Sequence, residues 1–480
     1  MTGKALLSDM AAGISIAQKT KGKKTEWTTS RWVTYTVYGL VLILGAVFFT
    51  SVLPPFRPYP YADEWTYRLP FSFTSVTQYL QWAFAQHVDH RIPIQKFLQF
   101  SILKASGFDF RYLVGFNFLL ACLLCAMLIG AARMYRGYQS IGDLIIPLTG
   151  LCFGAGFTLW GFQFQFLSST LFVVSFLFLA IVYDRHKNTY QLNAALLCLA
   201  LCSWCGINGM VMSSALSAAL AGYFIHERLK GQPIHPLSTY CLLVLCIGLN
   251  IILWRCWIPS AASDLHHFAP LELATFVYGL LPSSLVVYSF TDTWWKSALV
   301  LALVLSAAWI VSSKIWRGNL TFADFALAST LAATLFLVFS ISSGRAKGDG
   351  GWNSVLAMHY GYLTIFLPLV SWLLISSQLS IKWSNLLGIL LVVVFARAFQ
   401  INAVWRYGVI TAALPHQSEL QQQLGADKDL PALVSKYVLD FTWKDQPNYK
   451  REVLEGISTF QKKGFKMYGQ PPAQSASRGP

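Results

Sequence analysis

Residues Trp32–Val52 read WVTYTVYGLVLILGAVFFTSV, and this stretch decides the fold class. It contains no charged side chain, and a helix of this length, rising about 1.5 Å per residue, covers the roughly 30 Å hydrocarbon core of a bilayer. Leu53-Pro54-Pro55 follows it, whereas a cleaved signal peptide has a shorter apolar region before a small-residue cleavage site. We therefore expect a retained membrane-spanning helix.

The composition extends this interpretation to the whole chain. Hydrophobic residues make up 55% of the 480 residues and charged residues 12%, with a mean hydropathy of +0.50, whereas about a quarter of a typical soluble domain is charged. These values predict an all-α polytopic membrane protein. The net charge of +15 does not indicate nucleic acid, because Lys and Arg stand mostly between apolar runs, where they set orientation and meet anionic membrane lipids.

Further apolar stretches predict about eleven transmembrane helices in total. Residues 271–290 are also apolar, but Pro282 and several serines interrupt them. Treating them as a surface-lying or re-entrant segment keeps Lys314 and Arg317 on the inner side with the other basic loops, as the positive-inside rule requires. After the first span, the predicted spans fall at 112–132, 144–159, 167–183, 190–206, 209–225, 237–257, 297–313, 321–341, 354–376 and 383–400.

This topology divides the chain into three parts. They are a basic cytoplasmic tail (1–31), a transmembrane domain (32–400) and an external C-terminal segment (401–480). Within the C-terminal segment, a helical pattern runs through 430–440, and 470–480 has the composition of a disordered tail.

The first external loop, residues 54–111, contains the densest group of ionisable side chains. Asp63-Glu64-Trp65 is followed by His87-Val88-Asp89-His90-Arg91. Such groups can deprotonate a hydroxyl, hold a divalent cation and bind a phosphate. Two amphipathic helices, 76–86 and one that begins at Pro93, are expected in the same loop, lying along the membrane surface.

The alternative interpretation of this loop is structural. Asp63 and Glu64 would then be solvated acids that pair with the nearby Arg57 and Arg68.

Other polar groups gather on the same outer side. Gln163 and Gln165 alternate with aromatic residues in a turn, and a glycine-rich loop places Arg345 and Lys347 where backbone N–H groups can approach a phosphate. This distribution indicates a polar site open to the outer face rather than a conduit across the membrane. The glycine-rich loop could equally be a plain flexible turn.

His359, Arg397 and Asp324 are ionisable residues within predicted spans. His359 and Arg397 fall near the outer ends of their spans, and each would either join the site or have a structural role. The structural role of His359 would be a hydrogen bond to a neighbouring helix, and that of Arg397 a contact with the lipid headgroups. Asp324, near an inner end, is explained by charge compensation at a helix N-terminus.

Nine cysteines fall almost wholly inside apolar runs. Cys122/Cys125 and Cys202/Cys205 have the Cys-x-x-Cys spacing of redox and zinc sites. Within a packed or lipid-facing helix, however, a thiol behaves as a small apolar group. We therefore expect no disulfide framework.

Taken together, these residues resemble the GT-C superfamily of integral-membrane glycosyltransferases, in a bacterial branch with an Asp-Glu-Trp motif. Asp63-Glu64-Trp65 matches that motif, and Asp89-His90-Arg91-Ile92-Pro93 matches the branch's Glu-His-Arg-Ile-Pro with Asp in place of Glu. The Trp-Gly-Phe-Gln turn at 160–163 and the Gly-Arg loop from Gly344 are also similar. Where the branch has Ser-Arg-Tyr, this chain has Met358-His359-Tyr360, so His359 supplies a cation only when protonated.

The resemblance implies inverting transfer of a sugar from a polyprenyl-phosphate donor to a glycan or lipid acceptor, at the outer face of a bacterial inner membrane. It implies Asp63, Glu64 and Asp89 as catalytic residues, with Asp63 as the general base. Glu64, Asp89 and His87 would also be the ligands of a divalent cation such as Mg²⁺ or Mn²⁺. The residues expected to bind the donor phosphate or the substrates are Trp65, His90, Arg91, Gln163, Gln165, Arg345, Lys347 and His359.

Two alternatives come from other functional classes. A lipid or polysaccharide transporter would be favoured by inverted repeats and by ionisable residues at the membrane midplane, and neither feature is evident. A non-catalytic partner in envelope assembly would contain Asp63-Glu64 as an ordinary loop.

Overall fold

The computed structural model describes residues 31–151, 160–231, 235–259, 270–285, 290–345, 360–425, 429–442 and 445–468. Within these ranges every regular element is a helix, and the strand-like pairing is limited to an isolated bridge between His87 and His90. The cysteines in these ranges are all free. The chain is therefore an all-α protein, as its composition predicts.

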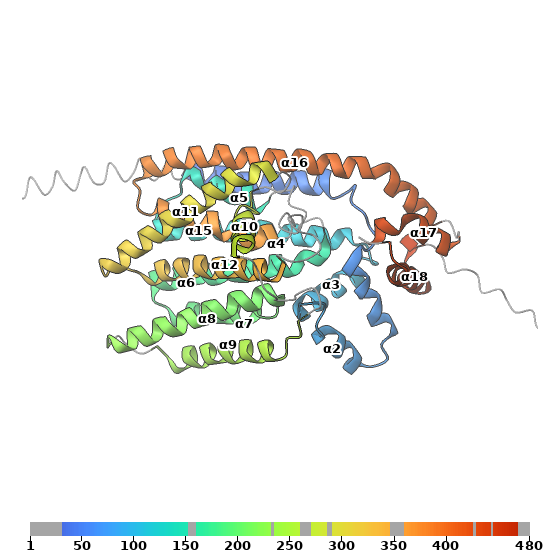
Figure 1. Ribbon diagram of the computed structural model, residues 1–480, viewed down its shortest axis with the longest axis horizontal. Helices are drawn as coiled ribbons and strands as arrows, with labels where there is room; N and C mark the ends of the chain where they lie inside the picture. The colour runs from blue at the N-terminus through green and yellow to red at the C-terminus, as the bar shows by residue number, and fades with distance from the viewer. Residues whose placement is uncertain are drawn as a thin grey trace, which may run out of the picture.

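Eight helices in the described part of the chain are long and apolar enough to cross a membrane, which makes this a multi-pass membrane protein (Figure 1). These crossing helices are Arg31–Val52, which ends in the π-helical turn η1 (Phe48–Val52), α4 (Arg111–Arg136), α6 (Phe164–His186) with the preceding turn η4 (Gly161–Gln163), α8 (Gly206–Leu229), α9 (Leu237–Arg255), α11 (Phe290–Trp316), α12 (Phe322–Arg345) and α16 (Ile381–Gly425).

Three other predicted spans overlap in part with shorter apolar helices. They are η3 with α5 (Ile141–Leu144 and Ile145–Gly150), α7 (Thr189–Cys202), and α14 with α15 (Gly361–Thr364 and Phe366–Ser376). The interrupted segment contains α10 (Pro270–Leu280), whose 11 residues rise only about 16 Å.

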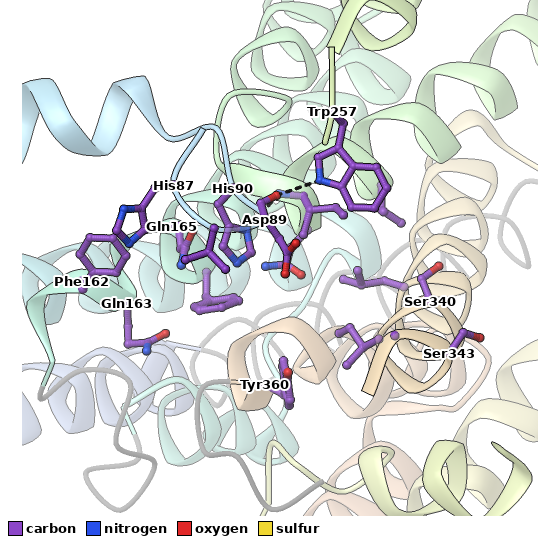
Figure 2. Close-up of a pocket in the computed structure, with 18 of the residues that line it drawn as sticks. His87, Asp89, His90, Phe162, Gln163, Gln165, Trp257, Ser340, Ser343 and Tyr360 are labelled. Atoms are coloured by element: carbon purple, nitrogen blue, oxygen red, sulfur yellow. Dashed lines mark hydrogen bonds between the residues drawn. The ribbon is translucent and has the colours of Figure 1, made fainter. Parts of the chain in front are cut away.

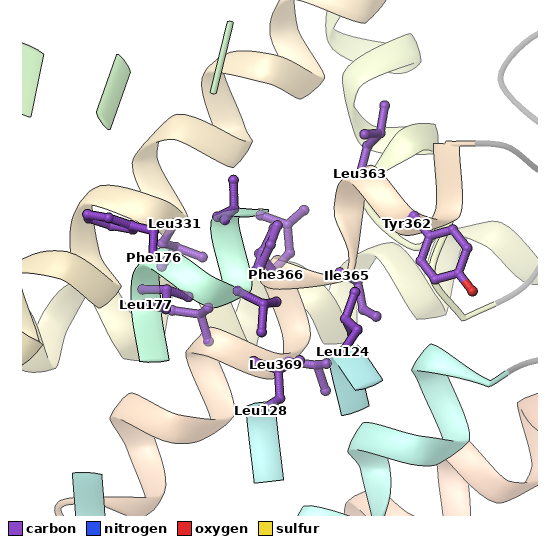
Figure 3. Close-up of a cluster of buried hydrophobic side chains, with 14 of the residues drawn as sticks. Leu124, Leu128, Phe176, Leu177, Leu331, Tyr362, Leu363, Ile365, Phe366 and Leu369 are labelled. Carbon is purple, nitrogen blue, oxygen red and sulfur yellow. The ribbon is translucent and has the colours of Figure 1, made fainter. Parts of the chain in front are cut away.

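Leucine and phenylalanine side chains from four helices pack in the centre of the bundle. Leu124 and Leu128 lie one turn apart on α4 and meet Leu177 of α6, Leu331 of α12 and Leu369 of α15 (Figure 3). All five are at most 5% exposed. Replacing any one by Ala would cost about 2–5 kcal/mol, so this core holds the crossing helices at fixed separations.

Basic helix ends gather at the end of the bundle opposite the loop of residues 54–111 (Figure 1). There, Lys314 Nζ lies 2.6 Å from Asp324 Oδ1, and the Tyr135 hydroxyl donates to the same carboxylate. Asp324 Oδ2 accepts the Thr321 N–H at 3.0 Å, so the predicted compensation at the α12 N-terminus is present.

The loop of residues 54–111 contains η2 (Ala62–Ser72) and the two amphipathic helices that the sequence predicts, α2 (Val76–Phe84) and α3 (Pro93–Ala105). Buried Lys96 ties α3 to the end of α2, because its Nζ donates to the carbonyls of Trp82 and Ala85 at 2.6 and 2.9 Å. Burial lowers the pKa of Lys96 to about 8.

The last helices reach back to this loop. α16 does not end at residue 400, where the last predicted span ends, but continues for 45 residues in all, about 68 Å. From its far end α17 (Leu430–Phe441) and α18 (Pro447–Lys462) fold onto η2, followed by the turn η6 (Lys466–Tyr468) (Figure 1). The helix predicted over 430–440 is confirmed.

Candidate active site

Three positions in the first loop have left-handed backbone angles that residues with a Cβ rarely adopt. Ala62 has φ 52° and Val88 has φ 51°, and they directly precede Asp63 and Asp89. The third, Phe108 with φ 63°, precedes Asp109, which forms an ion pair with Arg111. Such a conformation costs roughly 1–3 kcal/mol and persists only where its surroundings hold it, most often at functional sites. Asp63 and Asp89 therefore stand on turns whose shape is imposed by the rest of the fold.

The turn that bears Asp89 is held from several sides. His87 and His90 exchange backbone hydrogen bonds of 2.7 and 2.8 Å, and Trp257 Nε1 donates to the Asp89 carbonyl at 3.1 Å (Figure 2). The Ile207 N–H donates to His90 Nδ1 at 3.3 Å. A neutral His90 ring therefore has its proton on Nε2.

Side chains of the first loop and of α4 form hydrogen bonds to the turn that begins α6. Glu64 Oε1 accepts the Phe162 N–H at 3.3 Å, and Gln95 Nε2 donates to the Phe162 carbonyl at 3.0 Å. Asn117 Nδ2 donates to the Gly161 carbonyl at 3.1 Å. These bonds fix the position from which the next side chains project.

The two turns, the start of α8 and the ends of α9 and α12 line a cavity of about 600 Å³ (Figure 2), a volume typical of small-molecule sites. Ser340 and Ser343 of α12 lie across the cavity from His87, and Tyr360 lies below (Figure 2). The polar lining residues are Asp63, His87, Asp89, His90, Gln163, Gln165, Asn208, Ser340 and Ser343, and the aromatic ones are Trp160, Phe162, Phe166, Trp254, Trp257, Phe336, Phe339 and Tyr360.

Three amide groups in this lining are buried and unpaired within the described structure. Gln163 Oε1, Gln165 Oε1 and Asn208 Nδ2 have no hydrogen-bond partner there, and none of these side chains is more than 4% exposed. A buried polar atom without a partner costs roughly 1–3 kcal/mol. The cavity thus offers acceptors and a donor to a ligand rich in hydroxyl groups.

Asp63 and His87 face each other at the cavity. His87 Nε2 lies 3.4 Å from Asp63 Oδ1, within range of an ionic contact but without hydrogen-bond geometry. Their side chains are 21–24% exposed. Asp63 is thus a partly exposed carboxylate at the cavity, beside a ring that can orient it.

The structure matches the alternative in which Arg57 and Arg68 pair with the acidic residues only in part, because neither arginine forms an ion pair with them in the described part of the chain and only the charge of Arg57 acts on Glu64. Arg68 instead forms ion pairs of 2.8 and 3.1 Å with Glu452 and Glu455 of α18. The Arg57 guanidinium lies over the Tyr61 ring, 4.2 Å from its centroid.

Glu64 points away from the cavity. Its Oε2 accepts the Tyr61 N–H at 2.8 Å, and the side chain is 2% exposed. Burial raises the pKa of this carboxyl to about 7, against the opposing effect of Arg57 and of the backbone donors. Glu64 therefore joins η2 to the α6 turn, and this placement gives it a positioning role rather than contact with a reacting group.

Trp65 and Arg91 also bind protein rather than the cavity. Trp65 Nε1 donates to the Phe441 carbonyl at 3.0 Å, and its ring stacks with Phe460 of α18. Arg91 donates to the carbonyls of Phe84 and Cys256 at 2.9 and 2.7 Å. Their placement does not support the substrate contacts expected for them.

The predicted metal ligands do not form a cluster. Among the residues that the structure describes, no three His, Cys, Asp or Glu side chains are arranged to hold a metal ion. The carboxylate of Glu64 is turned toward backbone N–H groups, away from Asp89 and His87 at the cavity. This set of side chains does not fit a metal site.

The structure does not place the remaining predicted residues at the cavity. Lys347, His359 and the side chain of Arg345 lie beyond the described residues. Arg397 is exposed on α16 and donates to Gln400 at 2.8 Å.

Sequence reasoning missed Asn208, Trp257 and Tyr360. Asn208 is a single polar residue at the start of an apolar stretch, which the sequence alone does not distinguish from a buried helix contact. Trp residues are common at membrane interfaces, so nothing in the sequence indicates that Trp257 hydrogen-bonds to the Asp89 turn.

The fold and the cavity define an all-α, multi-pass membrane protein with an acidic, aromatic-walled cavity at the end opposite its basic helix ends. Comparisons of the chain with protein-family models, with curated proteins and with solved structures found no match.

Proposed function

We propose that this chain is a glycosyltransferase that moves a sugar from a polyprenyl-phosphate donor to a glycan or lipid acceptor of the cell envelope. The observation that favours it most is the cavity itself, in which Asp63 and Asp89 stand among unpaired buried amides. Sugar hydroxyls satisfy such amides, and aromatic walls suit the apolar faces of sugar rings.

In the proposed reaction Asp63 takes the proton of the acceptor hydroxyl. The acceptor oxygen then forms a bond to the anomeric carbon as the bond from that carbon to the phosphate oxygen breaks. The electron pair of that bond leaves with polyprenyl phosphate, and the configuration inverts. His87, 3.4 Å from Asp63, orients the base, and Asp89 with Gln163 and Gln165 positions the sugar.

A lipid-linked donor suits the wall that α12 provides. Phe336 and Phe339 line the cavity, yet they are 55% and 49% exposed on a helix able to cross the membrane. A donor whose polyprenyl chain stays in the bilayer can therefore bring its sugar to the cavity from the side. In this proposal Arg345, Lys347 and His359 hold the leaving phosphate.

The proposal also sets the topology. The three shorter apolar helices complete about eleven crossings of a bacterial inner membrane, with the basic helix ends in the cytoplasm. The cavity and the C-terminal helices then face the periplasm.

The test uses purified protein in nanodiscs and a panel of radiolabelled polyprenyl-phosphate sugars. We expect release of polyprenyl phosphate by the wild type and a loss of at least about a hundredfold in Asp63→Asn, the scale of general-base catalysis. Asp184→Asn makes the same chemical change on an acid paired with Lys187 at the other end of the bundle, and it should retain full activity. Equal release by Asp63→Asn and the wild type would remove Asp63 from the mechanism.

Folded wild-type protein that releases nothing with any donor would favour the transporter or the envelope-assembly partner. A flux assay with the same lipids in sealed vesicles then separates those two alternatives.

A further inference from the structure

A second cavity, of about 610 Å³, lies at the basic end of the bundle, where Arg31–Val52, α4 and α6 meet. Its position is remote from the first external loop, and the proposed transfer reaction does not use it. The lining residues are Tyr38, Ala126, Met127, Gly130, Arg133, Met134, Gly137, Phe178 and Arg185.

Two arginines from different helices line this cavity. Arg133 is in the last turn of α4 and Arg185 in the last turn of α6, and both are exposed. Neither guanidinium has a hydrogen-bond or ion-pair partner within the described part of the chain. The nearby acid, Asp184, is already paired with Lys187 at 2.6 Å. An uncompensated pair of guanidinium groups is suited to a phosphate, which can accept hydrogen bonds from both.

The remainder of the cavity is apolar and lies deeper along the helices. Phe178 is about 10 Å along α6 from Arg185, and Gly130 is a similar depth along α4 from the helix end. Gly130 keeps the space open, because a Cβ there would lie 3.3 Å from the Phe178 ring. The cavity therefore has a charged opening and an apolar interior, on helices able to cross a membrane. A phospholipid has the matching polarity, with a charged headgroup and an apolar acyl chain.

We propose that this cavity binds an anionic phospholipid, with its phosphate between Arg133 and Arg185 and an acyl chain along Met127 and Phe178. A free phosphate would use the arginines but leave the apolar floor empty. A zwitterionic lipid would fill the floor but bring its own cation to the two arginines.

The experiment measures lipid binding to the purified full-length chain by native mass spectrometry. The probes are phosphatidylglycerol, phosphatidylcholine and inorganic phosphate. Arg133→Gln/Arg185→Gln removes both charges, and Arg228→Gln/Lys382→Gln is the matched control, since it removes two basic residues that do not line the cavity. Gly130→Leu fills the cavity and keeps both arginines, and Gly222→Leu makes the same change where a Cβ meets open space.

We expect phosphatidylglycerol to bind the wild type, and the double arginine variant to bind it about thirtyfold more weakly, which corresponds to about 2 kcal/mol. Gly130→Leu should lose the same binding, and both controls should keep it. Unchanged binding in the double arginine variant would overturn the proposal, as would equal binding of phosphatidylcholine or competition by inorganic phosphate. Should Gly130→Leu fail to fold, the arginine pair alone decides the outcome.

Discussion

Replacing Gly456 by Ala should loosen the contact between the C-terminal helices and the loop of residues 54–111. An added Cβ would lie 2.3 Å from Trp65 Cε3 and 2.5 Å from Cζ3, closer than real Cβ contacts. The Trp65 ring is 1% exposed and its Nε1 is bonded to the Phe441 carbonyl, so the ring cannot swing aside and α18 must move. Overpacking of this kind costs about 1–3 kcal/mol. Ala favours a helix over Gly by about 1 kcal/mol, so a net loss reports the clash.

A second substitution tests whether Trp65 is the cause. Trp65→Phe shortens the ring that the new Cβ would meet, and it loses the Nε1 hydrogen bond, worth about 0.5–1.5 kcal/mol. In the double variant the clash is relieved. The combined loss should therefore be smaller than the sum of the single losses, by about 0.5–3 kcal/mol.

Amide hydrogen exchange of α18 in nanodiscs, read by mass spectrometry, measures the free energy of this local opening. Ser458→Ala, on the same helix but away from Trp65, should leave the exchange within about 0.5 kcal/mol of the wild type. Unchanged protection in Gly456→Ala, or strictly additive losses in the double variant, would refute the packing argument.

Three further predictions concern stability and turn geometry. Burial raises the Glu64 pKa from 4.5 to about 7, so the contribution of Glu64 to stability is complete below pH 4.5 and is lost as the pH rises through 7. The free energies of unfolding of the wild type and Glu64→Gln should therefore change relative to each other by about 3 kcal/mol over that pH range. A difference that does not depend on pH would contradict this. Val88→Gly should relieve the left-handed strain, raising stability by up to about 1 kcal/mol while lowering polyprenyl-phosphate release, and unchanged release would separate the strain from function. Asp143→Asn leaves the fully buried Arg136 without its ion pair and should cost about 3–5 kcal/mol in thermal unfolding, whereas a loss under 1 kcal/mol would mean that other groups compensate.

Much of the fold could be predicted from the sequence because the bilayer limits the choices. Runs such as Trp32–Val52 and the α2 and α3 patterns have unambiguous lengths or periods, and the structure contains these helices. The end of α16 could not be predicted, because hydropathy reports where a helix leaves lipid and not where it stops being helical.

The candidate site was predictable only in part, for a related reason. Asp63, Asp89 and His90 stand out by charge, and the structure places all three at one cavity. Charge does not distinguish a side chain that faces a cavity from one that holds the fold, so Glu64 and Arg91 were grouped with them. Only the three-dimensional contacts separate the two roles, since Glu64 bonds to the α6 turn and Arg91 to two distant carbonyls.

The bond between Trp65 and the Phe441 carbonyl joins positions 376 residues apart, and this separation affects the timing of biosynthesis. At about 5–20 residues per second, a ribosome needs roughly 20–75 s to make the intervening chain. Throughout that interval Trp65 lacks its contacts with Phe441 and Phe460, although Tyr67 and Phe71 of η2 can already pack against Trp82 and Phe108 of the same loop. Exposed apolar surface is what chaperones and proteases act on, so docking of α17 and α18 is expected to lower the exposure of a newly made chain to them. The C-terminal helices thus link this exposure to the completion of synthesis.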